Sequence, residues 1–214
     1  MRGASRTSFA GLTERLEAEN ITSAAVATRL GDELFAVVGL LDAEHGLRRA
    51  LSDPGKPAAE KAAVASALLH GKVTGRTEAL VVAAVESRWA SSGDMVDAIE
   101  QLAIEALALA AQAEDGLDDL EDGLFRFGRV VAAQPELSAA LASTWLPADR
   151  KEQLLSSLIR GKVTPVTLRL ITQMVTHPRG RALPVALDMC ASIAARRRHR
   201  AGRGAALRHG QRAA

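Results

Sequence analysis

An internal repeat constrains the fold of this chain more than any other feature of its sequence. The stretch Gly-Lys-Val-Thr occurs at residues 71–74 and again at residues 161–164, each time between two apolar segments. When the chain is shifted by 90 positions along itself, 18 of the 50 pairs over residues 31–80 are identical without a gap. An Ala- and Leu-rich chain would give about 4 such pairs by chance. The chain therefore contains two copies of one structural unit.

A Gly-Lys pair in front of a helix also invites a nucleotide-binding interpretation. A P-loop needs Gly-x-x-x-x-Gly-Lys-Ser/Thr, because its backbone N–H groups surround the phosphates and its hydroxyl holds magnesium. Here Ser66 and Ser156 stand at the upstream glycine positions, and Val73 and Val163 stand where the hydroxyl is required. The repeated motif is therefore predicted to be structural.

The spacing of the apolar residues predicts an all-α fold of two tandem six-helix bundle units. Hydrophobic residues make up 48% of the chain, aromatic residues only 3%, and the apolar mass is mostly Ala, Leu and Val at helical spacing. Helices are expected over residues 8–19, 24–41, 47–51, 58–69, 74–89, 94–111, 115–131, 135–141, 149–159, 164–176 and 182–196.

The offset of 90 residues is short for two separate bundles of this kind, so the helix over residues 94–111 is predicted to serve both units. Two apolar stripes run along it: Met95, Ile99, Leu102, Ala106 and Leu109, and then Ile104, Leu107 and Ala111. A helix that is apolar on two faces can pack on both sides. The alternative is a helix buried in one larger core. The expected domains are residues 1–111, residues 94–195 and an Arg/Ala/Gly-rich tail over residues 196–214 that is disordered.

The sequence contains no residue cluster typical of catalysis, and neither a cofactor nor a metal is expected. The five histidines lack the spacing of metal ligands, and Cys190 lies in an apolar helix, where a small core residue is commoner than a nucleophile. A single cysteine also fits a reducing cytoplasm. No run of about 18 apolar residues suggests a membrane span, and the N-terminal segment lacks the apolar core of a signal peptide.

Charge is distributed unevenly along the chain. Residues 196–214 hold seven arginines and no acidic residue, so residues 1–195 carry −5 although the whole chain carries +2. An acidic body with few aromatic residues argues against a nucleic-acid surface. An Arg-tailed nucleic-acid-binding protein and a free-standing α-helical adaptor stay open as alternative functions.

One long stretch carries a family resemblance. Residues 136–175, ELSAALASTWLPADRKEQLLSSLIRGKVTPVTLRLITQMV, resemble the N-terminal domain of the delta subunit of F-type ATP synthases, the bacterial relative of the oligomycin-sensitivity-conferring protein. The stretches LFRFGR at residues 124–129, HPRGR at residues 177–181 and SRW at residues 87–89 resemble the actinobacterial form. The likeness covers roughly residues 1–200.

This resemblance implies a non-catalytic subunit of the peripheral stalk, or stator, of a proton-translocating ATP synthase. Such a subunit links the catalytic head to the membrane-anchored stalk, at the cytoplasmic face of the cell membrane. The implied partners are the alpha subunits, through an N-terminal helix, and the stalk b subunits, with one copy per complex. Nucleic acid is not an implied partner, and membrane association is indirect.

The resemblance also suggests where a partner helix binds. In the family, the helix occupies an apolar groove between the first and fifth helices of the bundle, a contact that depends on buried area and not on chemistry. On the fifth helix of the second unit, one apolar stripe is assigned to the core: Val163, Val166, Leu170 and Met174. The residues assigned to the partner groove are Leu168, Ile171 and Val175, together with Ile104 and Leu107. The alternative is that both stripes of this helix are buried internally.

The chain departs from the family after residue 200. The family continues into a C-terminal domain of strands and helix that engages the stalk subunits, whereas this chain reads AGRGAALRHGQRAA. We expect a frameshifted or truncated gene product, and a genuine basic tail touching lipid headgroups is the alternative.

Overall fold

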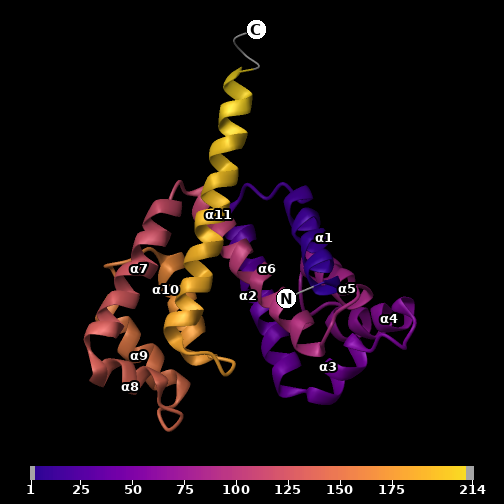
Figure 1. Cartoon of the computed structure of the whole chain (residues 1–214), viewed down its shortest axis with the longest axis horizontal. Coiled ribbons are helices and arrows are strands. Elements are labelled where there is room, and N and C mark those ends of the chain that lie inside the picture. The colour runs from indigo at the N-terminus through magenta and orange to yellow at the C-terminus, as the bar shows by residue number, and fades with distance from the viewer. Residues whose placement is uncertain (1–2, 211–214) are drawn as a thin grey trace. The chain divides into compact units, whose positions relative to one another are not determined.

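Every regular element in the described part of this computed structural model is a helix (Figure 1). The structure describes the backbone of residues 3–210 and the side chains of residues 3–202. Within that part, strand-like pairing is limited to one isolated bridge between Arg160 and Val163. The all-α prediction is confirmed. The helices are α1 (Ala4–Ala18), α2 (Ala24–Ala43), α3 (His45–Ser52), α4 (Ala58–Leu69), α5 (Gly75–Glu86), α6 (Ser92–Ala113), α7 (Leu117–Ala133), α8 (Pro135–Ala142), α9 (Ala148–Ile159), α10 (Pro165–Thr176) and α11 (Leu183–Gly210).

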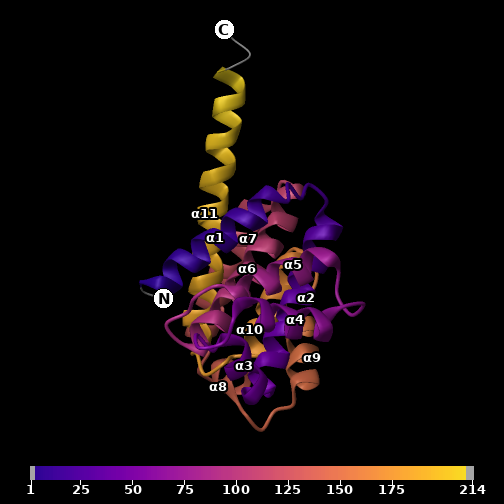
Figure 2. The same cartoon turned by 90° about the vertical axis from the view of Figure 1, so that its right-hand side faces the viewer.

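The chain divides into two compact units, Met1–Ala106 and Leu107–Ala214, and the division falls inside α6. In the first unit α5 packs against α1, α2 and α4, and α3 contacts α2 and α4 (Figures 1 and 2). In the second unit α10 packs against α7, α9 and α11, and α11 lies along α7. Among the described residues, no helix combines the length and the hydrophobicity that a transmembrane span requires.

The repeat seen in the sequence reappears in the helix boundaries. Adding 90 to the bounds of α3, α4 and α5 gives the bounds of α8, α9 and α10. Buried polar residues also recur at this offset, because Lys61 and Lys151 are both buried and so are Thr77 and Thr167.

The two Gly-Lys-Val-Thr stretches each end one helix and start the next. Gly71 and Gly161 have φ angles of 73° and 78°, in the left-handed region that a residue without a Cβ enters most readily. The N–H groups of the lysines that follow them donate to carbonyls of the preceding helix, to Leu69 O at 2.9 Å and to Ile159 O at 3.0 Å. The motif is therefore a helix-to-helix turn.

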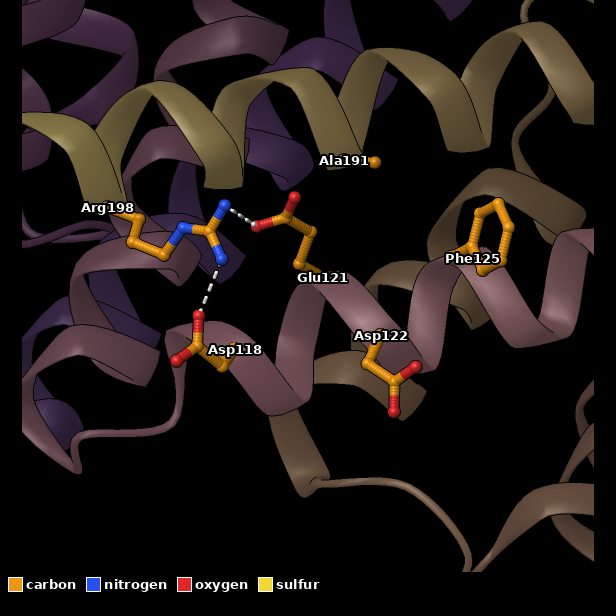
Figure 3. Close-up of a pocket in the computed structure, with 6 residues that line it drawn as sticks. All are labelled: Asp118, Glu121, Asp122, Phe125, Ala191 and Arg198. Atoms are coloured by element: carbon orange, nitrogen blue, oxygen red, sulfur yellow. Dashed lines mark hydrogen bonds and ion pairs between the residues drawn. The ribbon is translucent and has the colours of Figure 1, made fainter.

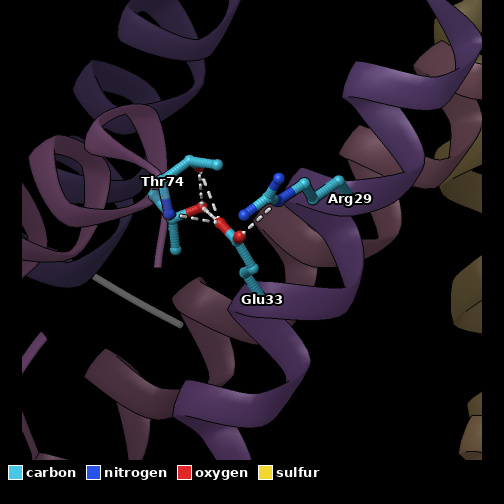
Figure 4. Close-up of polar contacts among 4 residues, drawn as sticks. Arg29, Glu33 and Thr74 are labelled. Atoms are coloured by element: carbon cyan, nitrogen blue, oxygen red, sulfur yellow. Dashed lines mark hydrogen bonds and ion pairs between the residues drawn. The ribbon is translucent and has the colours of Figure 1, made fainter. Parts of the chain in front are cut away.

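A carboxylate fixes the start of α5 against α2 in the first unit (Figure 4). Glu33 on α2 accepts hydrogen bonds from Thr74 N at 2.9 Å, Thr74 Oγ1 at 2.7 Å and Thr77 Oγ1 at 2.5 Å. Arg29 Nε donates to the other carboxylate oxygen of Glu33 at 2.8 Å. Partial burial by itself raises the pKa of Glu33, but these hydrogen bonds outweigh it and lower the pKa from 4.5 to about 2.

The second unit joins the corresponding helices without a carboxylate. Residue 123 takes the place of Glu33 and is a glycine, while Thr164 and Thr167 keep their hydroxyl contact at 2.8 Å. A Cβ on Gly123 would lie 2.8 Å from Thr167 Cγ2, closer than real side-chain carbons approach. The absence of a side chain on α7 therefore allows α10 to approach closely.

We expect Gly123→Ala to destabilise the protein by about 1–2 kcal/mol, because the steric clash outweighs the helix-propensity gain of about 1 kcal/mol. Thr167→Ser removes the clashing methyl group and should recover part of that loss in the double variant. Gly39→Ala is the matched control, because a Cβ there meets no atom within 4 Å, and it should leave stability unchanged or raise it. Urea denaturation measures all three, and a neutral Gly123→Ala would contradict the close approach.

Helix α11 extends into the segment that was expected to be a disordered tail. Residues 196–210 continue this helix, and residues 211–214 lie outside the described residues. Arg197 is only 3% exposed and its Nε donates to Gln112 Oε1 at 3.1 Å. The arginine run thus begins inside the fold. The physical reason is that Ala and Arg are good helix formers, so a helix anchored by Ile193 and Ala194 continues at little cost.

Candidate partner-binding surface

The stripe of α10 that was assigned to the core is buried. Val166, Leu170 and Met174 are all at most 6% exposed, and Val163, just before the helix, is half-buried. Thr164 caps the helix, because its Oγ1 accepts a hydrogen bond from Thr167 N at 3.2 Å, and Pro165 is well suited to the first helical position. This side of α10 was read correctly from the sequence.

The stripe assigned to the partner groove is also largely buried. Ile171 and Val175 are 0% and 2% exposed, and only Leu168 is half-exposed. Ile104 and Leu107 on α6 are fully buried. Apolar side chains on both faces of α10 are therefore removed from water in the isolated chain, and the assignment of these residues to a partner contact stays a prediction. Leu168 is thus the one of these five residues that solvent reaches to a substantial extent.

Helix α6 is more completely buried than its two apolar stripes required. Glu100 and Glu105 on this helix are each only 2% exposed, and both have partners. The burial of these two carboxylates was not predicted, because a single charge inside an apolar run usually marks the solvent side of a helix.

An open groove does exist on the second unit, between α7 and α11 (Figure 3). A hollow of about 560 Å³ is lined by Asp118, Glu121, Asp122 and Phe125 from α7 and by Ala191 and Arg198 from α11. A second hollow of about 230 Å³ shares Phe125 and Ala191 with the first, so the two are neighbours along α7 and α11. We call the two hollows together the α7–α11 groove.

Small and apolar residues shape the second hollow. The hollow stays open because three of its lining residues have small side chains or none: Gly128, Ala132 and Ala191. Its apolar lining comes from Leu124 and Leu187. The ring of Phe125 is 62% exposed at the junction of the two hollows, and the guanidinium of Arg129 lies 5.9 Å from its centroid. An exposed aromatic ring beside a hollow of this kind is typical of a contact that a partner covers.

Charged side chains line the first hollow. Arg198 reaches from α11 to Asp118 at 2.7 Å and to Glu121 at 3.3 Å, as Figure 3 shows. The hydrogen bond to Asp118 and the charge of Glu121 raise the pKa of Arg198. Asp122 pairs with Arg126 on its own helix at 2.6 Å. Among the lining residues that the structure describes, three carboxylates face one guanidinium, so this part of the hollow favours a partner that brings positive charge.

The groove was not predicted from the sequence. In the sequence, Phe125 and Arg129 belong to the LFRFGR stretch, and Arg198 belongs to the segment expected to be a tail. An aromatic residue exposed on an otherwise amphipathic helix was the available signal, but its meaning depends on α11 lying alongside.

The described residues contain no group of three or more His, Cys, Asp or Glu side chains that could hold a metal ion. Cys190 is fully buried and forms no disulfide, as expected of a small core residue. What the surface of the second unit offers is shape, apolar area and charge.

Comparison with known proteins places these observations in a family. Residues 104–202 match the family model described as ATP synthase delta (OSCP) subunit. The chain is 47% identical over 200 residues to the ATP synthase subunit delta of Streptomyces griseus, covering 94% of this chain and 74% of that protein. It is 43% identical over 197 residues to the subunit delta of Thermobifida fusca, with 92% and 72% covered. For Acidothermus cellulolyticus the identity is 40% over 203 residues, with 94% and 74% covered.

Proposed function

Because this chain belongs to the ATP synthase delta (OSCP) family, and is therefore a non-catalytic subunit of the peripheral stalk of an F-type ATP synthase, we propose that its second unit binds the catalytic head. The observation that carries the assignment is 47% identity to an ATP synthase subunit delta over 94% of the chain. The subunit joins the head to the membrane-anchored stalk, where it associates peripherally with the membrane through the complex. We place it at the cytoplasmic face, with one copy per complex and with alpha and b subunits as its neighbours.

A stalk subunit transmits force and performs no chemistry, so its contacts must withstand torque. A preformed apolar groove suits this task, because burying a partner helix stabilises the contact through area and shape. The all-helical second unit, with an open groove between two packed helices, supports this role.

We also propose that the chain is a duplication of one six-helix bundle in which α6 serves both copies. The recurrence of helix bounds at an offset of 90 residues supports the duplication. Two observations support the shared helix: the division between the units falls inside α6, and both of its apolar stripes are buried.

The partner helix in this proposal is the N-terminal helix of an alpha subunit. Of the residues assigned to it from the sequence, Leu168 is the one that a partner can reach in this structure, whereas contact with Ile171, Val175, Ile104 or Leu107 would require their present neighbours to move. The α7–α11 groove needs no such change, so it is the stronger candidate for the contact. Its excess of carboxylates favours a helix with basic residues at one end.

We expect Phe125→Asp to lower the affinity for isolated ATP synthase heads by about tenfold or more, because an exposed aromatic anchor is replaced by a charge. Isothermal titration of the full chain into heads that lack this subunit measures the effect. Val64→Asp is the matched control, since Val64 is a partly exposed apolar residue on α4 of the first unit. If Phe125→Asp leaves the affinity for heads unchanged and Leu168→Asp lowers it, the partner helix contacts α10 and not the α7–α11 groove. Failure of the unmodified chain to bind heads would overturn the proposed function itself.

A further inference from the structure

A hollow in the first unit gathers positive charge. Its volume is about 180 Å³, and it lies among the end of α3, the start of α4 and the residues that follow α5. The charged side chains lining it are Lys56, Lys61 and Arg88, with the carboxylate of Glu86 opposing them. The lining therefore has an excess of two positive charges.

Lys61 is the unusual member of this lining. It is only 5% exposed, and its side chain has neither a hydrogen bond nor an ion pair with any residue that the structure describes. An ammonium group has three donors, and none of the three on Lys61 has an acceptor among the described residues, so all of them are available to a ligand. Because Lys61 lines the hollow, an anion bound there could accept hydrogen bonds from its ammonium group.

The start of α4 adds further donors. This helix of 12 residues begins after Pro57, which supplies no side-chain acceptor, and Ala58 at its first position lines the hollow. The backbone N–H groups of Ala58 and Ala59 find no acceptor among the described residues. The N-terminus of a helix carries a positive partial charge and favours anions.

We propose that this hollow binds a phosphate group. A phosphate carries nearly two negative charges and several acceptor oxygens, which match the excess charge of the lining and the free donors of Lys61 and α4 better than a single carboxylate does. The phosphate belongs either to free inorganic phosphate or to the headgroup of an anionic lipid. This site is independent of the head contact proposed for the second unit.

The second unit provides an internal comparison. Lys151 occupies the position of Lys61 and is similarly buried, at 6% exposed. The residues that correspond to Lys56 and Arg88 are Leu146 and Pro178, so the additional cations are missing there. The proposal therefore applies to the first unit alone, and Lys151 offers a matched control.

Trp89 gives the site its own reporter, because it lines the hollow and is only 8% exposed. The only other tryptophan, Trp145, is 93% exposed in the second unit and can be removed as Trp145→Phe. In that background, titration with inorganic phosphate at constant ionic strength, with chloride as the comparison, should give a saturable change in Trp89 fluorescence.

Lys61→Met should weaken the apparent affinity for phosphate about tenfold or more, the loss expected for a charge-assisted hydrogen bond. Lys151→Met should leave the affinity unchanged, and Glu86→Gln should raise it.

Flotation with phosphatidylcholine vesicles, with and without phosphatidic acid, decides the source of the phosphate. Binding to the phosphatidic acid vesicles that is lost in Lys61→Met assigns the site to a lipid headgroup, and fluorescence changes with inorganic phosphate alone assign it to the free ion. If Lys61→Met fails to fold by circular dichroism, the exposed Lys56→Met and Arg88→Met variants test the same charge requirement. A phosphate titration identical to chloride, together with no phosphatidic acid dependence, would overturn the proposal. An unchanged phosphate affinity in Lys61→Met, or in both Lys56→Met and Arg88→Met, would also overturn the proposal.

Discussion

Ile171→Asp is expected to destabilise the protein by about 4 kcal/mol or more, because it places a carboxylate where no water reaches. The Ile171 side chain is 0% exposed on α10, between the buried Leu170 and the half-buried Thr172. An ionised Asp there is unsolvated, and a protonated Asp still leaves a cavity and unsatisfied polar atoms. Urea denaturation followed by far-UV circular dichroism measures the loss.

Leu168→Asp is the control for this prediction. Leu168 lies three residues earlier on the same helix and is half-exposed, so its substitution should cost only about 1 kcal/mol. Equal losses at the two positions would contradict the burial of Ile171. A substitution at Ile171 therefore reports on stability and cannot serve by itself as a test of partner binding.

Glu33→Gln is expected to remove about 2 kcal/mol of stability near pH 7, because the native hydrogen bonds favour the carboxylate and solvent weakens the contact with the exposed Arg29. The side chain of Glu33 is 13% exposed whereas that of Arg29 is 69% exposed, so solvent screens the ion pair with Arg29 more than the hydrogen bonds from the threonines. Gln retains the shape and can accept some of the hydrogen bonds, but it carries no charge to favour the Arg29 and threonine donors.

The effect of Glu33 should depend on pH in a defined direction. The native pKa of about 2 lies below the ordinary value of 4.5, so the contribution is fully present above pH 4.5 and is lost as pH falls toward 2. The difference in unfolding free energy between the parent and Glu33→Gln, measured in urea from pH 7 to pH 3, should therefore shrink below pH 4.5. The exposed Glu152→Gln should show no such difference, and a Glu33 effect that is constant over this range would contradict the lowered pKa.

Most helix boundaries could be predicted because local chemistry sets them. The expected α4 range of residues 58–69 is the observed one, since Pro57 precedes it and Gly71 ends it in a left-handed turn. The helix expected over residues 94–111 would begin at Asp94, a typical capping residue, but α6 begins at Ser92, and Asp94 accepts a hydrogen bond from Ser5 Oγ at 2.6 Å. A capping residue could not be told from a tertiary acceptor because its partner lies 89 residues away.

The candidate site was harder to predict. Two apolar stripes on α10 were recognised, but periodicity shows only that a face is apolar and not whether a core or a partner covers it. The α7–α11 groove depends on the small residues of α7 facing α11, and Arg198 became part of it only because α11 continues where a tail was expected.

The sequence by itself determined the helices, their 90-residue repeat and the family, because hydrogen bonding within a helix, turn chemistry and internal similarity are all local to the chain. Only the tertiary structure decided which apolar faces are covered, which carboxylates are paired and where hollows remain. Glu33 and Gly123 stand at corresponding positions of the repeat and illustrate the difference. The carboxylate of Glu33 binds α2 to the start of α5, whereas Gly123 allows α7 and α10 to pack closely because it has no side chain. Burial and partner choice depend on residues far apart in sequence, and these meet only when the helices pack.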